Sequence, residues 1–482
     1  MSNNSIKNMS LYAISLFLVK GMSLLTLPLM ANYLSPDQLG HLEFIGVTTV
    51  FFSMLIGLAM HENLYRFIGT IKNQVQRTKT AGQLYTATIL ISAGLGISTF
   101  TIYNLLGAPL SEISETQSFL IGIVLCYEAP LAIGLAWLRL HNQAMLFFKV
   151  CMLTVFAQIS LLVSILLYQP DVTLIFAANV LCTLGQFVFL HCYLPFKIHL
   201  PTWERLQGYL RYSTPLMLSA MVAFALSGAE RWFIAGYTDL TTLGIYAIAA
   251  KFALAVGIMI QPFHMWWMPK RFQVQETKGN LSVAKTIQQG ALLLCVIAVA
   301  LSWASQLFIT LALPDIYHQA AKLVTMTILI MVFKELTEMI NIGILYAKQT
   351  TKLLYINLTA IAIAFTIGAL TIDHGIEAIL TALLCGQVSR FLFALIISQK
   401  LLPLPYNIGA TFGLISLSVL LIFSGGFDQT QAITWLMLFL QPLALISYAH
   451  RVKLIELKLI RKQLAHSKST LSSGKGKERH YG

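Results

Sequence analysis

Long apolar stretches separated by short polar turns recur along nearly the whole chain. Each is close to the roughly 20 residues that a helix needs to cross the hydrocarbon core of a bilayer. No segment shows the apolar–polar alternation of a barrel strand. Besides closed barrels, only helices satisfy all their backbone hydrogen bonds within lipid. The pattern predicts an all-α polytopic membrane protein with about fourteen spanning helices, at residues 10–32, 42–63, 82–106, 117–138, 145–168, 172–195, 208–236, 240–268, 286–312, 319–347, 353–372, 375–398, 406–425 and 430–450.

Composition excludes a soluble domain that merely carries an anchor. Of the 482 residues, 57% are hydrophobic and 11% are charged, whereas soluble domains carry about 25% charged residues. The stretch at 10–32 is too long for the core of a signal peptide and lacks a small-residue cleavage site, so we expect it to be retained as a first helix.

The basic residues predict the orientation of the chain. With a cytoplasmic N-terminus, most of the 32 Lys and Arg residues fall in loops on the cytoplasmic side or in the tail, whereas the opposite loops carry acids such as Asp37, Asp171 and Asp315. This is the positive-inside pattern, and it places both termini in the cytoplasm. The net charge of +13 therefore reflects topology rather than binding to nucleic acid.

Motifs for enzymatic chemistry are absent from the sequence. It contains no P-loop, no GxGxxG after a strand and no HExxH, so we expect no cofactor, no metal site, no catalytic residues and no ATP hydrolysis by this chain. The six cysteines all fall in predicted spans and form no CxxC, so we interpret them as small packed residues. The segment 451–482 is polar and basic, typical of a cytoplasmic tail near anionic headgroups.

A weak internal repeat indicates two halves of similar organisation. Tyr33 to Gly40 aligns without gaps with Tyr237 to Gly244, with identical Tyr, Leu and Gly residues, and each segment follows a span that leaves the cytoplasm. We therefore predict an N-terminal lobe at 1–205, a C-terminal lobe of parallel orientation at 206–400, two further spans at 401–450 and the tail at 451–482, with substrate between the lobes.

Several short segments carry a resemblance to a known family: Tyr33 to Gly40, LAMHENLYRFIG at 58–69, LRYSTPL at 210–216 followed by ERWFI at 230–234 and LGIYAIAAK at 243–251, and Tyr346 to Lys348. They resemble Wzx-type polysaccharide flippases, in the multidrug/oligosaccharidyl-lipid/polysaccharide exporter superfamily. The similarity covers about residues 7–400 and marks the family better than the substrate.

The resemblance implies a fold and a function. Members of that family form a V-shaped pair of helix bundles around a central lumen and work by alternating access. By this likeness the substrate is undecaprenyl diphosphate carrying an oligosaccharide repeat unit of O-antigen, lipopolysaccharide or another surface polysaccharide, in the bacterial inner membrane. Besides membrane lipids, the partners implied are the polymerase and chain-length machinery of the same pathway.

Charged residues inside the predicted spans are the candidates for the site. A charge at the centre of a helix costs roughly 2.5–3.5 kcal/mol on insertion scales, so it should face a cavity or a partner, and Lys and Arg complement a diphosphate. Lys20 and Lys251 lie well inside their spans, one in each predicted lobe, and either bind substrate or pair with a nearby acid. Arg231, beside Glu230 at a span end, fits a gate or a substrate contact.

The second half of the chain adds further candidates. Lys334, Glu338 and Asn341 share one helical face, and this spacing fits either a Lys–Glu pair or a polar stripe lining the lumen. Arg390 presents the same alternatives, and Arg66 lies near the cytoplasmic mouth. The substrate-binding candidates are thus Lys20, Arg66, Arg231, Lys251, Lys334 and Arg390, and the ion-coupling candidates are Glu128, Glu335 and Glu338.

Three alternatives remain at this stage. A drug or cation exporter of the same superfamily would favour unpaired acids in its lumen. A flippase for the peptidoglycan lipid precursor is implied by the resemblance to carry several arginines in its first two spans, where this first span offers only Lys20. A lipid-linked sugar polymerase or glycosyltransferase would need a larger outer loop than the one of about ten residues near 107–117.

Overall fold

The computed structural model describes residues 3–69, 71–105, 112–426 and 430–454, and every regular element within these ranges is a helix. The predicted tail lies outside the described residues from 455 onward. The helices are α1 Asn3–Leu25, α2 Leu27–Tyr33, α3 Pro36–Gly57, α4 Met60–Asn63, the π-helix η1 Leu64–Ile68, α5 Gln74–Leu105, α6 Glu115–Leu140, α7 Ala144–Tyr168, α8 Val172–Tyr193, α9 Trp203–Ala225, α10 Glu230–Tyr237, α11 Leu240–Trp267, α12 Arg271–Ala312, the 3-10 helix η2 Asp315–Tyr317, α13 Ala320–Ile340, α14 Ile342–Tyr346, α15 Thr350–Thr371, the 3-10 helix η3 Ile372–His374, α16 Ile376–Leu401, α17 Ile408–Ser424 and α18 Gln431–Arg451.

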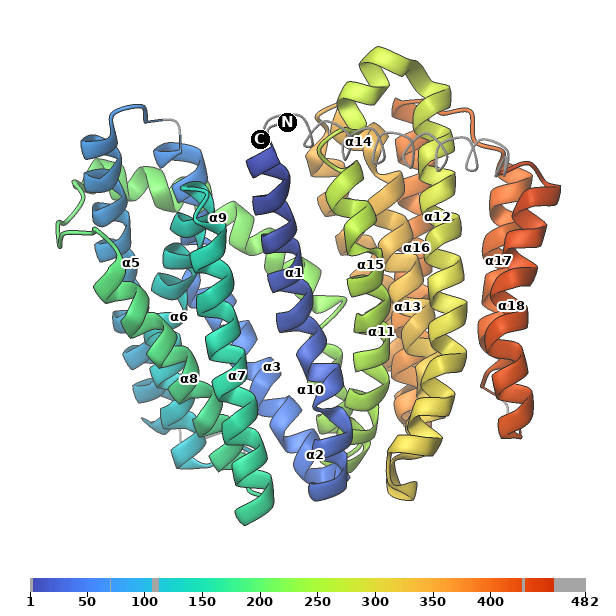
Figure 1. Cartoon of the computed structure of the whole chain (residues 1–482), viewed down its shortest axis with the longest axis horizontal. Coiled ribbons are helices and arrows are strands. Elements are labelled where there is room, and N and C mark those ends of the chain that lie inside the picture. Colours follow the sequence, from blue (N-terminus) through green and yellow to red (C-terminus); the bar gives the residue numbers. More distant parts are fainter. Residues whose placement is uncertain (1–2, 70, 106–111, 427–429, 455–482) are drawn as a thin grey trace, which may run out of the picture.

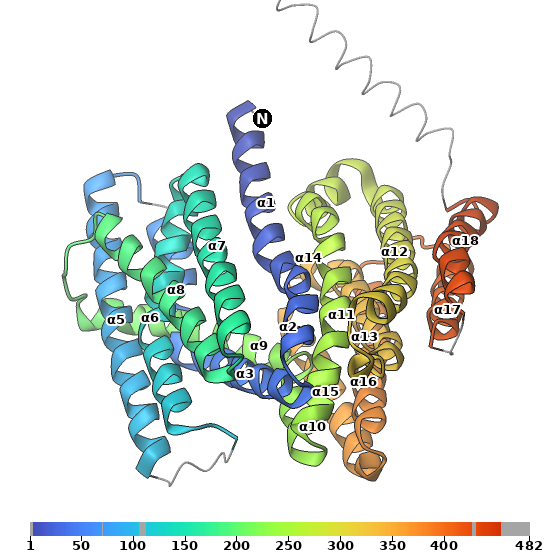
Figure 2. The same ribbon diagram turned by 60° about the horizontal axis from the view of Figure 1, so that its bottom comes forward.

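The helices gather in two groups. Helices α5–α8 lie on one side of the molecule and α11–α18 on the other, with α1 between them (Figure 1), and the turned view shows the same division (Figure 2). We call α3–α8 the N-terminal bundle and α11–α18 the C-terminal bundle. Helices α17 and α18 pack on α12 at the far edge of the C-terminal bundle. The bounds predicted for the lobes, at 1–205, 206–400 and 401–450, stay a prediction.

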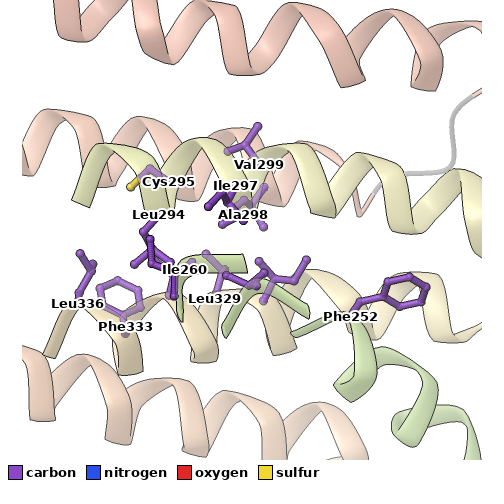
Figure 3. Packing of buried hydrophobic residues seen from close by; sticks show 14 of the residues in the cluster. Phe252, Ile260, Leu294, Cys295, Ile297, Ala298, Val299, Leu329, Phe333 and Leu336 are labelled. Carbon is purple, nitrogen blue, oxygen red and sulfur yellow. The ribbon is translucent and has the colours of Figure 1, made fainter. Parts of the chain in front are cut away.

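Buried apolar side chains form two clusters that follow these bundles. One cluster draws mainly on α3–α8, with a few residues of α9, α10, α11 and α16 added. The other draws mainly on α11–α18; Figure 3 shows Phe252 of α11 and Leu294 of α12 in this packing. Since lipid tails are as apolar as these side chains, van der Waals packing holds such helices together rather than exclusion from water.

Ten described helices are long and apolar enough to cross a membrane, and the bent pair α9–α10 brings the number to eleven. Helix α17, at 17 residues, falls short of that length. The all-helical polytopic architecture predicted from the sequence is confirmed, whereas this count does not confirm the number of fourteen.

Four spans predicted as continuous helices are divided in the structure: 10–32 at Thr26, 42–63 after Gly57, 208–236 after Ala225 and 319–347 at Asn341. The span at 42–63 breaks after α3, where Leu58 and Ala59 adopt left-handed backbone angles with φ of 48° and 49°. The span at 208–236 divides into α9 and α10, which meet at 45°. A left-handed residue other than glycine costs of order 1–3 kcal/mol and persists only where its surroundings impose it. Hydropathy averaged over a whole span does not report such a break, because it does not depend on the backbone angles of single residues.

The two repeat segments begin their helices in the same way. The Ser35 side chain accepts a hydrogen bond from the backbone N–H of Gln38 at 3.2 Å, and Pro36 occupies the first turn. At the aligned position the Asp239 carboxylate accepts from the N–H of Thr242 at 2.6 Å. Both are N-caps that satisfy otherwise unpaired backbone donors, so α3 and α11 begin at equivalent points of the repeat.

Candidate functional site

The two bundles meet where α3 and α11 cross. A Cβ atom at Gly40 would lie 1.8 Å from the carbonyl oxygen of Leu240, and one at Gly244 would lie 1.9 Å from that of Pro36. The contact is therefore reciprocal: in each half, the glycine of the repeat segment receives the backbone at the start of the other half's helix. Small residues permit such close approach between membrane helices, which gives the aligned glycines a physical role.

An ion-pair cluster lies beside this crossing. Arg231, on α10, places its Nε 2.9 Å from Glu43 Oε1 on α3 and its Nη1 2.7 Å from Glu230 Oε1. Lys251, on α11, forms no ion pair with a described residue, but it is close enough for its charge to act on Glu43. We call Glu43, Glu230, Arg231, Tyr246 and Lys251 the Arg231 cluster. One predicted cation of this cluster, Arg231, contacts Glu43 directly, and the second, Lys251, acts on it from farther away.

Glu230 is the most buried acid of this cluster, with 5% of its side chain exposed. Its Oε1 accepts a hydrogen bond from the Tyr246 hydroxyl at 3.0 Å, whereas its Oε2 has no hydrogen-bond partner among the described residues. Glu230 also lines a cavity of about 450 Å³ whose other walls are mostly apolar residues of α9, α10, α15 and α16. The cluster thus borders an apolar space that holds one carboxylate.

Three of the other predicted cations remain unpaired. Lys20, on α1, and Arg66, on η1, are exposed, and Lys334, on α13, is half-buried. None of the three forms an ion pair with another described residue. The structure therefore does not bring them to the Arg231 cluster, and the pairing that the spacing of Lys334 and Glu338 suggested is not formed.

Arg390 is paired instead, at the centre of a second polar network. Its Nη2 lies 2.9 Å from Glu338 Oε1, and its Nε donates to Asn357 Oδ1 on α15 at 2.8 Å. Asn341 donates to Glu338 at 3.2 Å and accepts from Arg271 at 3.3 Å. We call this the Arg390 network. It links four helices of the C-terminal bundle and leaves the Glu338 side chain 41% exposed.

The remaining ion-coupling candidates each have a polar partner. Glu335 Oε2 lies 2.8 Å from His264 Nε2, between α13 and α11, and both side chains are at least 85% buried. Glu128, on α6, accepts a hydrogen bond from Ser53 on α3. Glu335 and Glu128 are thus each held by a polar side chain from another helix.

Sequence reasoning missed the partners of these groups. Glu43 was detectable, because it is an acid inside the predicted span 42–63. His264, Asn357 and Ser53 gave no comparable signal, since each is a single polar residue whose partner comes from another helix. Hydropathy locates a charge within a span and leaves its rotational position relative to other helices undetermined.

The family described as "Polysaccharide biosynthesis protein" matches residues 5–275, more than half of the chain. The chain belongs to the polysaccharide biosynthesis protein family. The match spans α1–α11 and the first turn of α12, and thus includes all of the Arg231 cluster. No curated protein matches this member of the family.

Solved structures show the fold of this polysaccharide biosynthesis protein family member. The lipid II flippase MurJ in an inward closed conformation aligns with a TM-score of 0.70 at 15% identity, covering 92% of this chain and 100% of its own. A multidrug resistance MATE family transporter in an inward-facing conformation aligns with a TM-score of 0.55 at 14% identity, covering 82% of this chain and 96% of its own. A MATE structure in complex with MaL6 gives 0.53 at 14% identity, covering 84% and 97%.

These similarities confirm the predicted all-helical fold of two bundles, which the chain shares with the MurJ and MATE structures. The chain is a multi-pass membrane protein of a polysaccharide biosynthesis family, and the similar structures are transporters rather than enzymes. The family assignment agrees in part with the resemblance stated from the sequence, without reaching the Wzx-type branch.

Proposed function

We propose that the chain is a flippase that moves undecaprenyl-diphosphate-linked oligosaccharide repeat units, of O-antigen or another surface polysaccharide, across a bacterial inner membrane by alternating access. The lipid tail stays in the bilayer while the sugar head group passes between the two bundles. Both termini lie in the cytoplasm, as the distribution of basic residues predicts.

The observation that carries the proposal is the ion pair of Arg231 with Glu43 between α10 and α3, with Lys251 of the neighbouring α11 close enough for its charge to act on the same carboxylate. Two cations on neighbouring membrane-spanning helices suit the two phosphate groups of a diphosphate, and arginine binds phosphate through parallel N–H donors. The fold supports the proposal, because one of the similar structures is described as a lipid II flippase.

Other charged residues take further roles in this proposal. Lys334 and Arg390 offer cations along the C-terminal bundle, and Lys20 offers one on α1 between the bundles. Arg66 meets the substrate near the cytoplasmic mouth. Three acids, Glu128, Glu335 and Glu338, are the candidates for carrying a coupling proton or sodium ion. The polymerase and chain-length machinery of the pathway receive the product.

Deleting the gene and measuring the lipid-linked intermediates tests the proposal. We expect single undecaprenyl-linked repeat units to accumulate on the inner leaflet and surface polysaccharide to disappear. The wild-type gene restores the polymer, whereas Lys251→Ala and Lys20→Ala do not at equal membrane levels. Lys352→Ala serves as the matched control, because Lys352 is exposed at the start of α15.

Two results of the deletion would reject the proposed flippase function. If single units reach the outer surface unpolymerised, the chain is a polymerase. If the lipid pool is unchanged, the chain is no part of the pathway.

A second candidate function, a MATE-like exporter of organic cations, is favoured by one observation. The cavity of about 450 Å³ is mostly apolar and bordered by Glu230, whose Oε2 lacks a hydrogen-bond partner among the described residues. An apolar cation would fill such a space and neutralise that oxygen. Drug sensitivity of the deletion strain, with an unchanged lipid pool, would support this function.

A further inference from the structure

The Glu43 carboxylate is paired with the Arg231 guanidinium, which the proposed substrate also needs for binding. The Arg231 guanidinium lies against Glu43 Oε1 through Nε and against Glu230 Oε1 through Nη1. Its Nη2 makes no hydrogen bond to a described residue, and 18% of the side chain is exposed. The guanidinium is therefore partly accessible, but carboxylates occupy two of its three nitrogen atoms, so an anion that needs two parallel N–H donors must displace one of them.

The same contact ties the two halves of the molecule together. Glu43 lies on α3, seven positions after the helix begins at Pro36, and Arg231 lies on α10. Trp232 adds a hydrogen bond from its Nε1 to Thr48 Oγ1, at 3.0 Å, between the same two helices. Next to them, α3 crosses α11 with backbone contact at Gly40. Releasing Glu43 from Arg231 thus removes one of the ties that hold α3 at this end.

We propose that Glu43 is a built-in competitor of the substrate, whose carboxylate must leave Arg231 before a diphosphate can bind, so that binding also loosens α3 from α10. This inference rests on the proposed function. Arginine pairs with carboxylate and phosphate through the same N–H geometry, so the two anions exclude each other. Glu43 is accordingly a positioning residue: it acts on the substrate through Arg231.

Competition from the Glu43 carboxylate also favours anions of higher charge at Arg231. A ligand with one negative charge would exchange one anion for another at Arg231 and gain little. A diphosphate brings more charge and more acceptor oxygens, and Lys251 provides a second cation for it. Once it is bound, repulsion between the diphosphate and the Glu43 carboxylate favours separation of α3 from α10. Recognition of the diphosphate and opening of this end are thereby coupled.

Binding of inorganic pyrophosphate to the purified full chain tests the competition. We expect Glu43→Gln to bind pyrophosphate about tenfold more tightly than wild type, because a charge-assisted contact worth about 1.5 kcal/mol no longer competes. Arg231→Gln should lose most of the affinity. Glu377→Gln is the matched control: it removes an exposed carboxylate from the first turn of α16 and should leave the affinity unchanged.

A purely structural role for Glu43 would give the opposite sign, since a loosened site binds more weakly. Unchanged or weakened binding by Glu43→Gln, with Glu377→Gln equal to wild type, overturns the inference. If Glu43→Gln does not fold, Glu43→Asp provides the same test. Its shorter side chain draws back from Arg231 but keeps its charge, so a smaller rise is expected and no rise overturns the inference.

Distances between spin labels report the opening. Labels at Asp37 and Tyr237, exposed residues of α3 and α10, are placed in a chain whose six native cysteines are replaced. Pyrophosphate should widen the distance in wild type and not in Arg231→Gln, and Glu43→Gln should be wider without ligand. Equal distances in all samples reject the coupling.

A separate measurement, of the lipid-linked repeat units in the deletion strain, tests the proposed function. Complementation by wild type together with unchanged affinity in Glu43→Gln rejects the inference alone. Failure of the deletion to alter the lipid pool rejects both.

Discussion

Replacing Gly40 by alanine probes the crossing of α3 and α11 directly. The new Cβ atom would lie 1.8 Å from Leu240 O, 2.8 Å from Leu240 C and 2.9 Å from Gly244 N. All three are backbone atoms, so no side-chain rotation can relieve the clash. A carbon normally approaches a carbonyl oxygen to about 3.3 Å, so the helices must separate by about 1.5 Å.

The energetic cost follows from that displacement. Overpacking a well-packed contact typically costs 1–3 kcal/mol, and a clash with rigid backbone belongs at the upper end. We expect Gly40→Ala to disfavour this closed crossing by about 3 kcal/mol, which is about two orders of magnitude in the equilibrium between closed and separated arrangements. Spin labels at Asp37 and Thr241 should show a longer distance as the main population.

Gly46 supplies a matched control in the same helix. An added Cβ there meets no atom within 4 Å, so Gly46→Ala should leave the distance unchanged, and the gain in helix propensity is about 1 kcal/mol at most. Gly244→Ala should reproduce the effect of Gly40→Ala, and the double variant should show less than the sum, because one separation relieves both clashes. If Gly40→Ala and Gly46→Ala give the same distances, the reasoning is refuted.

Three further predictions concern the C-terminal bundle. Arg390→Gln should lower stability by about 1 kcal/mol, and a double-mutant cycle with Glu338→Gln in thermal unfolding should show coupling between the two. Trp303→Phe should lower the stability of the α12–α18 contact by about 1–3 kcal/mol, because the buried Gln441 Oε1 atom loses its donor at 2.6 Å. Faster cleavage of α18 in limited proteolysis would measure this loss of stability. Glu335→Gln should abolish any dependence of transport on a proton gradient while pyrophosphate affinity stays unchanged, as tested in proteoliposomes.

Each of these predictions has a control within the chain. Trp435→Phe changes a half-exposed tryptophan of α18 and should leave proteolysis unchanged. His318→Gln alters a histidine–carboxylate pair at 3.6 Å whose Asp315 is fully exposed, and it should leave the proton dependence intact. Additive effects of Arg390→Gln and Glu338→Gln would contradict the Arg390 network. Equal proton dependence in wild type and Glu335→Gln would remove Glu335 from the coupling candidates.

The aligned repeat segments show how much of the structure a short sequence similarity predicted. Its identities were few, yet the aligned glycines lie against each other's helix in the structure, and the aligned Ser35 and Asp239 both cap helices. The alignment indicated two similar halves. That the aligned segments contact each other is a property of their packing, which the alignment does not contain.

The candidate site was only partly predictable, for a related reason. Arg231, Lys251, Arg390 and Glu335 were recognised because a charge within an apolar span is costly and therefore conspicuous. Their partners were assigned less well: Glu338 pairs with Arg390 of α16 rather than with Lys334 on its own helix. Spacing along one helix gives the neighbours on that helix and does not rank them against a residue from another helix.

The sequence by itself determined that this protein folds in a lipid bilayer and that its secondary structure is helical. A chain with 57% hydrophobic residues in stretches of membrane-spanning length must fold in a bilayer as helices, because lipid offers the backbone no hydrogen bonds. The tertiary structure alone decided where spans break and which charges meet, such as Glu43 with Arg231. Those outcomes depend on the rotation and depth of each helix against its neighbours, and hydropathy is insensitive to both.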